Sequence, residues 1–352
     1  MSPPHRHAGH CILAPEILRN IARNGTAAQR ERALATLGVD LTFRTMRAQA
    51  LFAPRPLPSR LTTPLRPHRS IYDGGGTTTL PGKPARSEGA RKTGDVAVTE
   101  AYDGLGATFA LYAEAYDRNS NADAGLELKA TVHHGQDYDN AFWNGEQMVF
   151  GDGDGELFNR FTVSLDVIGH ELTHGVTEIE AQLQYLGQSG ALNESVSDVF
   201  GSLVKQKALG QTAAEADWLI GEGLFTKKVK GQALRSLSEP GSAFDDPVLG
   251  KDPQPGHMGD YVHTTSDNGG VHTNSGIPNR AFCLAAVGIG GQACEQAGLV
   301  WYDTVRDPSL RSNATFAQFA ALTVNTAGKR YGRTSAEAGA VSDAWSEVGV
   351  LS

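Results

Sequence analysis

The chain has 352 residues, of which 40% are hydrophobic and 20% charged, and its formal net charge is −8. This composition is typical of a soluble globular protein with one large domain or two smaller ones. The negative charge argues against nucleic acid or an anionic membrane as the main partner, because either would favour a basic face. The 3 cysteines, with no CxxC pair, are too few for a disulfide framework.

The N-terminal stretch "MSPPHRHAGHCILAPEILRNIARNG" has no apolar run of the kind that forms the core of a signal peptide. No later stretch approaches about 18 consecutive apolar residues, so no transmembrane helix is expected. Sec export is therefore not indicated. Two possibilities stay open, namely release by a non-classical route and retention in the cytoplasm as a zymogen.

Two short helices are expected near the N-terminus, in "PEILRNIARNG" and in "TAAQRERALATLGV". Each has a glycine after its expected end, and Gly38 is predicted to close the second helix. The following region is rich in Pro and Gly, which predicts a loop-like connector. We therefore expect a small helical unit over residues 1–51 and a linker, with the start of the mature chain, over residues 52–93.

A helix followed by strands is expected next. The stretch "DVAVTEAYDGLGATFALYAEAYDR" has a helical pattern, and "NAFWNGEQMVFGDG" contains Asn144-Gly145, a strong hairpin signal. Further helices are predicted at 158–183, 191–209, 275–290, 315–330 and 335–348. Strands early and helices late indicate an α+β fold. Residues 94–178 should form a lobe of antiparallel sheet plus helix, and residues 179–352 a mainly helical lobe.

The decamer "DVIGHELTHG" carries two histidines four positions apart. On an α-helix, His170 and His174 lie on one face one turn apart, so both imidazoles can reach a single metal ion, with Glu171 beside them. A catalytic zinc takes three protein ligands and keeps one position for water. Because buried or solvated histidines can produce the same pattern, a third ligand has to be found.

The stretch "SGALNESVSDVFG" supplies that ligand in Glu194, on a second helix that can fold back beside the first. Asp198, four residues later on the same face, can accept the other ring N–H of His170 and so fix its tautomer. Two acids on a helix would otherwise indicate a solvated face. Their distance from the histidine pair instead favours a zinc site made of His170, His174 and Glu194.

Several further motifs occur in order, including "NAFWNGEQMVFGDGDG", "RSLSEP", "DNGGVHTNSGIPNRAF" and "VSDAWSEVGV". On these motifs and the two zinc motifs, the chain from about Gly94 to its C-terminus resembles the thermolysin family of zinc neutral proteases. The leader with "CILAPEILRNIARNG" is similar to the protealysin-like subgroup, whose short precursor segment folds against the catalytic domain and blocks the cleft. The resemblance implies a two-lobed zinc endopeptidase made as a zymogen.

The resemblance also implies catalytic roles. Glu171 would be the base that takes a proton from the attacking water. Tyr185 and His272 would donate hydrogen bonds to the developing oxyanion, and Asp267 would orient His272. A zinc-binding scaffold without activity, which is the alternative function, would have no physical need for Glu171, Tyr185 and His272.

Substrate binding follows from the same resemblance. Asn140 and Ala141 would bind the substrate main chain as a strand edge does, and Arg235 would hold a substrate carbonyl. An apolar pocket would prefer Leu, Phe or Ile on the leaving side of the scissile bond, although each lining residue taken singly is more often plain core. The implied lining is Phe158, Phe161, Val167, Ile220 and Leu234.

One cluster departs from the family pattern. Asp166, Asp217 and Glu222 match carboxylates of the family's calcium-binding cluster, but Lys205 stands where another acid is expected. An ammonium can neutralise carboxylates as a point charge with three donors. We therefore expect Lys205 to replace the double calcium site, while calcium elsewhere stays possible. An exposed, solvated lysine is the alternative.

Residues 1–51 are expected to form an inhibitory propeptide, removed by a cut within residues 52–72. Cys11 could ligate the zinc until that cut, or pack as a small buried residue. The expected partners are protein and peptide substrates and the chain's own propeptide. Neither a nucleic acid nor a membrane partner is expected, and the protein should be a monomer.

Overall fold

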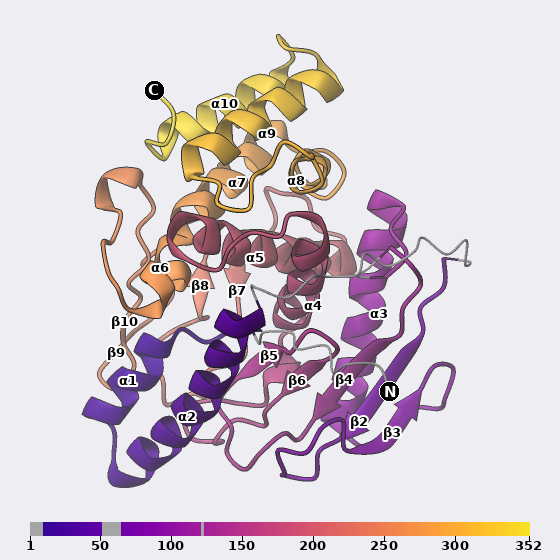
Figure 1. The fold of residues 1–352 in the computed structure, drawn as a ribbon, viewed down its shortest axis with the longest axis vertical. Helices are drawn as coiled ribbons and strands as arrows, with labels where there is room; N and C mark the ends of the chain where they lie inside the picture. The colour runs from indigo at the N-terminus through magenta and orange to yellow at the C-terminus, as the bar shows by residue number, and fades with distance from the viewer. Residues whose placement is uncertain (1–9, 51–64, 121–122) are drawn as a thin grey trace.

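The computed structural model describes residues 10–50, 65–120 and 123–352. Two helices come first along the described chain, α1 (Pro15–Asn24) and α2 (Ala27–Ala50). A lobe that carries a sheet follows, and then a mainly helical lobe toward the C-terminus (Figure 1). The α+β prediction, with a helical propeptide unit ahead of two lobes, agrees with this arrangement.

A six-stranded sheet in the order β1-β5-β6-β4-β2-β3 forms the base of the N-terminal lobe. β4 pairs in parallel with both β2 and β6, so the sheet is mixed and not antiparallel throughout as predicted. The Asn144-Gly145 turn joins β5 to β6 as an antiparallel hairpin, as expected. The strands are β1 (His10–Cys11), β2 (Arg69–Asp73), β3 (Lys83–Ser87), β4 (Leu128–Val132), β5 (Ala141–Trp143) and β6 (Met148–Phe150).

The strands β2 and β3 correct the loop predicted over residues 52–93. They pair with each other, and Ile71 of β2 is buried in the core. The Pro- and Gly-rich residues between them form the turns of this hairpin, where Gly75, Gly76 and Gly82 have positive φ. Strands of five residues beside so many turn residues are too short to show a clear alternation of apolar and polar residues, so the sequence did not reveal them. Residues 51–64 of the predicted linker lie outside the described part.

The two N-terminal helices form a tight hairpin. α2 begins with a capping box, in which Gln29 N–H donates to Thr26 Oγ1 (3.3 Å) and Thr26 N–H donates to Gln29 Oε1 (2.8 Å). Gly38 does not end this helix as predicted. A glycine inside a helix costs about 1 kcal/mol relative to alanine but does not break it, and α2 continues to Ala50.

The helices α4 (Leu165–Glu180) and α5 (Gly187–Leu209) lie at the centre of the molecule, and α3 (Val96–Tyr116) packs beside α4 and the sheet (Figure 1). Two glycines allow α4 and α5 to pack closely. A Cβ atom on Gly201 would lie 2.4 Å from the carbonyl oxygen of Asp166, and one on Gly169 would lie 3.0 Å from Cα of Gly201. This contact sets the two predicted zinc motifs against each other.

The C-terminal lobe contains five further helices, of which α6 and α8 were not predicted because both are short. The elements after α5 are β7 (Leu219–Ile220), β8 (Arg235–Ser236), β9 (Asp245–Asp246), β10 (Gly250–Lys251), a 3₁₀ turn at Met258–Asp260, α6 (Asp267–Asn274), α7 (Gly276–Ile289), α8 (Ala297–Val305), α9 (Phe316–Tyr331) and α10 (Ala336–Glu347). Another 3₁₀ turn, Phe161–Val163, precedes α4. Among the residues that the structure describes, no helix combines the length and apolar character that crossing a bilayer requires.

Candidate active site

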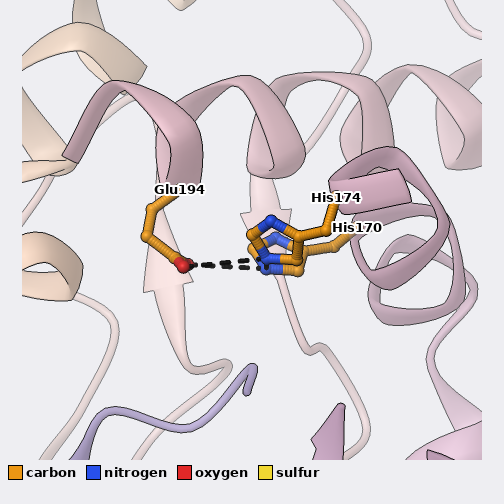
Figure 2. Close-up of side chains that lie close together, drawn as sticks. All are labelled: His170, His174 and Glu194. Atoms are coloured by element: carbon orange, nitrogen blue, oxygen red, sulfur yellow. Dashed lines mark hydrogen bonds and ion pairs between the residues drawn. The ribbon is translucent and has the colours of Figure 1, made fainter. Parts of the chain in front are cut away.

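His170, His174 and Glu194 converge on one point between α4 and α5, as Figure 2 shows. The Nε2 atoms of the two histidines are 3.0 Å apart. Glu194 places Oε2 at 3.5 Å from His170 Nε2 and Oε1 at 3.7 Å from His174 Nε2. One ligand atom from each of the three residues lies within 4.8 Å of the other two, and all three side chains are buried.

This arrangement fits a divalent metal ion. Two imidazole nitrogens at 3.0 Å can share only one proton, and Glu194 Oε2 is buried without a hydrogen-bond donor in the described chain. A buried carboxylate and two convergent nitrogen lone pairs are unfavourable without a cation. The set of two imidazoles and one carboxylate is also a common ligand set of catalytic zinc.

Asp198 joins His170 to Arg235. Its Oδ1 lies 2.8 Å from His170 Nδ1, Arg235 donates to both carboxylate oxygens (2.8 and 2.9 Å), and Asn279 Nδ2 donates to Oδ2 (2.9 Å). Burial alone would raise the pKa of Asp198, but the charge of Arg235 and the hydrogen bond with His170 lower it below its usual range. An ionised Asp198 accepts the Nδ1–H of His170, which leaves the Nε2 lone pair for a metal.

His174 has partners that the sequence analysis missed. Its Nδ1 lies 2.9 Å from Asn193 Oδ1 and 3.0 Å from Ser197 Oγ. Both residues come from α5, directly before Glu194 and three residues after it, so they border the face that carries the carboxylate. Their polar side chains close to Glu194 in "GALNESVSDVFG" were the available signal.

Tyr185, His272 and Asp267 meet beside Glu194. The Tyr185 hydroxyl donates to Glu194 Oε1 and lies 3.4 Å from His272 Nε2. Both carboxylate oxygens of Asp267 are 3.0 Å from His272 Nδ1. Residues 268–270 have positive φ, a conformation that Gly269 and Gly270 adopt without strain, and this turn folds Asp267 back onto His272.

A segment of the N-terminal unit runs along β5 next to this group. β1 pairs antiparallel with β5, with His10 opposite Trp143 and Cys11 opposite Phe142. The pairing adds a strand to the edge of the sheet, which is how extended peptides bind to exposed β-edges. The N-terminal unit therefore lies along the sheet edge that was predicted to bind substrate.

The same segment continues with main-chain hydrogen bonds to predicted substrate-binding residues. Ile12 N–H donates to the Ala141 carbonyl (3.1 Å), and Leu13 N–H donates to Asn140 Oδ1 (3.1 Å). Arg235 Nη1 donates to the Ile12 carbonyl (2.9 Å). Upstream of these contacts, the carbonyl oxygen of Cys11 lies 2.8 Å from His272 Nε2.

Two family models match the chain, "Thermolysin metallopeptidase, catalytic domain" over residues 68–178 and "Thermolysin metallopeptidase, alpha-helical domain" over residues 181–350. The chain belongs to the thermolysin family of metallopeptidases. It is a metalloendopeptidase with an α+β fold of the thermolysin type. The family match begins at residue 68, ahead of the predicted start at Gly94, because β2 and β3 are part of the catalytic sheet.

Relatives in the thermolysin family match nearly the whole chain. "Extracellular metalloprotease" of Pectobacterium carotovorum subsp. carotovorum is 53% identical over 342 residues, covering 96% of each chain. "Protease PrtS" of Photorhabdus sp. is 48% identical over 347 residues, covering 96% of this chain and 91% of the relative. The solved "Precursor of Protealysin, Metalloproteinase from Serratia proteamaculans" has a TM-score of 0.89 and 53% identity, covering 97% of this chain and 100% of that chain.

The apolar residues predicted to line the thermolysin-family pocket are all at most 2% exposed: Phe158, Phe161, Val167, Ile220 and Leu234. They belong to the same hydrophobic cluster as Ile12 and Leu13, which are both 0% exposed. The rings of Phe158 and Phe161 are 5.9 Å apart. The N-terminal segment and the predicted pocket thus share one continuous apolar core.

The Cys11 thiol does not join the metal-ligand group of this thermolysin-family site. Cys11 is buried in a separate small cluster with Tyr138, Phe142 and Val149, and no set of ligand atoms that includes its sulfur converges within 4.8 Å among the described residues. The main-chain carbonyl of Cys11 reaches the site instead. Packing, the alternative reading of Cys11, agrees with this placement.

Lys205 lies among Asp166, Asp217 and Glu222, the three acids that it was predicted to neutralise. Its Nζ is 3.1 Å from Asp166, 2.8 Å from Asp217 and 3.9 Å from Glu222, and it donates to the Leu219 carbonyl (3.0 Å). Burial alone would lower the pKa of Lys205, but the charge of Asp166 and the hydrogen bond to Asp217 raise it. Lys205 is 7% exposed, which excludes the solvated alternative.

The helix α2 adds contacts that were not predicted. Asp40 accepts hydrogen bonds from the Tyr138 hydroxyl and from Asn140 Nδ2, both at 2.9 Å. Arg32 Nη2 lies 3.1 Å from Asp154 and 2.7 Å from Glu156. Arg32 and Asp40 are eight residues apart, and this two-turn spacing on one helix face was the available signal.

The helix α1 instead contacts the C-terminal lobe of the thermolysin-family fold. Asn20 Nδ2 donates to the Leu249 carbonyl (3.0 Å), and Arg19 Nη1 donates to Ser266 Oγ. Ser266 directly precedes α6, the helix that carries Asp267 and His272. The N-terminal unit therefore holds both lobes of the catalytic domain.

Proposed function

We propose that the chain is the zymogen of a zinc endopeptidase in which residues 1–51 are an inhibitory propeptide. The observation that carries the proposal is the convergence of His170, His174 and Glu194 beside a main-chain carbonyl that His272 holds. A carbonyl held by a hydrogen-bond donor that itself lies 3.5 Å from Glu194 Oε2 is in position for hydrolytic attack. An inactive scaffold would gain nothing from that placement, so this alternative is not favoured.

The side chains around the ligand group take complementary roles in peptide hydrolysis. A bound zinc ion would polarise the carbonyl and lower the pKa of a coordinated water. Glu171, buried next to His170, takes the proton of the water and delivers it to the leaving nitrogen. Tyr185 and His272 donate to the carbonyl oxygen as negative charge develops, and Asp267 stabilises the doubly protonated imidazole that this donation needs.

Substrate recognition relies on the groups that hold the N-terminal segment. Asn140, Ala141 and Arg235 bind the main chain, so they accept many sequences. Selectivity comes from the apolar residues around the leaving side, which favour a hydrophobic residue after the scissile bond. These pocket residues are Phe158, Phe161, Val167, Ile220 and Leu234.

We further propose that Lys205 replaces the double calcium site of the family. Its Nζ is within 4 Å of Asp166, Asp217 and Glu222, and its own positive charge offsets theirs. A cation that is covalently part of the chain cannot dissociate. The zymogen should therefore not depend on calcium at this place.

The cut that separates the propeptide from the mature chain is proposed within residues 52–72, followed by the lobes 94–178 and 179–352. Relatives whose names include "extracellular" favour action outside the cell. Fractionation of cells that express the chain without tags will separate non-classical release from cytoplasmic retention. We expect a monomer without nucleic-acid or membrane partners, which sedimentation velocity with and without DNA or anionic vesicles can check.

The decisive experiment follows the intact mass of the purified full-length chain with time, beside the Glu171→Ala variant. The wild type should lose a segment that ends within residues 52–72 and gain activity on a fluorogenic peptide with a hydrophobic leaving-side residue. The variant should stay whole and inactive. A zinc-loaded wild type that neither cuts itself nor hydrolyses the peptide after proteolytic activation would disprove the proposed function.

A further inference from the structure

The N-terminal segment crosses the site in the register of a substrate. Three successive residues contribute main-chain groups: the carbonyl of Cys11, both the N–H and the carbonyl of Ile12, and the N–H of Leu13. Their partners are His272 for the first, Ala141 and Arg235 for the second, and Asn140 for the third. All four partners are groups proposed above to bind or activate a peptide.

This register identifies one peptide bond. The carbonyl that meets the proposed oxyanion donor belongs to Cys11, at 2.8 Å from His272 Nε2. The residue on the leaving side is therefore Ile12, whose side chain is 0% exposed in the same apolar cluster as Phe158 and Leu234. A hydrophobic leaving-side residue is what the proposed pocket favours, so the main-chain contacts and the residue type of Ile12 point to the same bond.

We propose that the Cys11–Ile12 peptide bond is a cleavage site for the chain's own catalytic centre, in addition to the cut within residues 52–72. The inference rests on the proposed function. The hydroxyl of a water molecule adds to the carbonyl carbon of Cys11, and the C–N bond to Ile12 breaks. At neutral pH both protons of the water end on the Ile12 nitrogen, which leaves a carboxylate on Cys11 and an ammonium on Ile12.

The shortened chain stays inhibited after this cut. The contacts of Ile12 with Arg235 and of Leu13 with Asn140 lie downstream of the broken bond. The hydrogen bonds of Asp40 on α2 are also downstream. Only residues 1–11 are freed, and a linked segment with several anchors remains at high effective concentration.

The test compares the full-length wild type with Glu171→Ala by intact mass and N-terminal sequencing over time. The wild type should yield a chain that begins at Ile12, with a half-time independent of protein concentration because the cut is intramolecular. Glu171→Ala should yield none. If Glu171→Ala produces the same new terminus, another protease made the cut and the inference is overturned.

Two variants examine the assignment of the bond. Ile12→Asp, which would bury a charge in the apolar cluster, should slow this cut at least tenfold, whereas the control Cys11→Ala should keep it. Because Ile12→Asp can unseat the segment, a synthetic peptide of residues 8–16 is also given to activated enzyme. Cleavage of this peptide between Cys and Ile supports the inference, and cleavage elsewhere opposes it.

Failure of the inference can be told from failure of the proposed function. If the wild type is cut within residues 52–72 and the released propeptide keeps an unbroken Cys11–Ile12 bond, the inference is wrong while the endopeptidase stands. If zinc-loaded, proteolytically activated protein hydrolyses no peptide at all, both are wrong.

Discussion

The metal-ligand group and the Lys205 cluster are built on the same two helices, yet they balance buried negative charge in different ways. α4 contributes Asp166 to one and His170, four residues later, to the other. α5 contributes Glu194 and Lys205. In the Lys205 cluster, an ammonium of the chain lies within 4 Å of three carboxylates. In the ligand group, Glu194 faces two imidazoles, and its Oε2 has no hydrogen-bond donor among the described residues.

In one cluster the balancing positive charge is part of the chain, and in the other it has to come from a metal ion in solution. A covalently attached cation keeps the Lys205 cluster neutralised at any ion concentration. The ligand group reaches the same balance only when a metal ion binds, and its stability then follows the concentration of free metal. Structural neutralisation and chemical reactivity are therefore divided between neighbouring turns of one helix pair.

Removal of zinc should have the largest effect. A strong zinc chelator should lower peptide hydrolysis by activated enzyme at least about 1,000-fold, because the metal supplies both the polarised carbonyl and the reactive water. Added zinc should restore the rate, measured with a fluorogenic peptide. Activity that survives complete zinc removal, checked by metal analysis, would contradict the ligand group.

Removal of the built-in cation should come next. Lys205→Met leaves three carboxylates without their ammonium, which should lower the free energy of unfolding by about 3–5 kcal/mol. Lys207→Met is the matched control on the same helix, since Lys207 pairs with the exposed Glu114 at 2.8 Å, and it should cost below about 1 kcal/mol. Denaturant unfolding of both variants in the Glu171→Ala background measures the difference, and equal losses would mean that Lys205 acts as a surface residue.

Replacing Lys205 with an acid should turn its cluster into one that needs a metal ion from solution. Lys205→Glu should bind calcium, with a gain of about 2.7 kcal/mol at a calcium concentration 100 times the dissociation constant. The melting temperature of the wild type should not respond to calcium or to a calcium-selective chelator. A wild type that loses many degrees on calcium chelation alone would refute replacement of the calcium site by Lys205.

A smaller effect is expected from Asn279, which supports Asp198. Asn279→Leu removes a hydrogen-bond donor to Asp198, and Asn279→Asp places a second carboxylate beside Asp198. Zinc affinity should therefore fall about tenfold, and the Asp variant should lose more affinity than the Leu variant. Competition with a chelator in full-length Glu171→Ala measures the affinity. If Asn279 acted only through packing, the Leu variant should lose more zinc affinity than the Asp variant, because Asp has nearly the same shape as Asn. Asn274→Asp, a buried residue of α6 that binds Val262, is the control and should leave zinc affinity unchanged.

Replacement of His133 should have the smallest effect. Like Lys205, His133 lies between carboxylates, but it is partly exposed and its positive charge depends on pH. It lies 2.8 Å from Asp152 and 2.9 Å from Asp95, and the hydrogen bond to Asp152 is the main cause that raises its pKa to about 9. A raised pKa stabilises the fold fully below about pH 6.5, and this contribution is lost as pH rises through 9. Solvent screening limits it to below about 1 kcal/mol. His133→Gln should flatten thermal stability between pH 6.5 and 9, and an unchanged slope would exclude the ion pairs as its cause.

The parts of the site that could be predicted from the sequence are those that depend on one helix turn. The spacing of His170 and His174, and that of Glu194 and Asp198, follows directly from helical geometry. The contact of Asn279 with Asp198 spans 81 residues and is set by how α5 and α7 pack, so no local pattern carries it. The Cys11 thiol could not be placed for a related reason. In a strand, a shift of one residue exchanges the two faces, and only the pairing with Phe142 fixes the register.

Long helices could be predicted from the sequence, whereas short strands could not. The α3 and α5 patterns extend over more than twenty residues each, whereas β2 and β3 have five residues each beside a turn-rich sequence. Parallel pairing of β4 with β2 depends on a crossover through α3, which residue alternation does not reveal. The continuation of α2 through Gly38 shows the converse, that a glycine, which costs only about 1 kcal/mol relative to alanine, is a weak stop signal.

The two N-terminal helices hold different lobes, α1 through Asn20 and Arg19, and α2 through Arg32 and Asp40. Breaking the chain between them and the mature protein leaves a non-covalent complex with two anchors, and each anchor keeps the other close enough to rebind. The lag between scission and full activity is then governed by a dissociation rate. Salt weakens the exposed part of the ion pairs that Arg32 makes with Asp154 and Glu156. Raising the salt concentration therefore becomes a way to shorten that lag without changing the rate of hydrolysis.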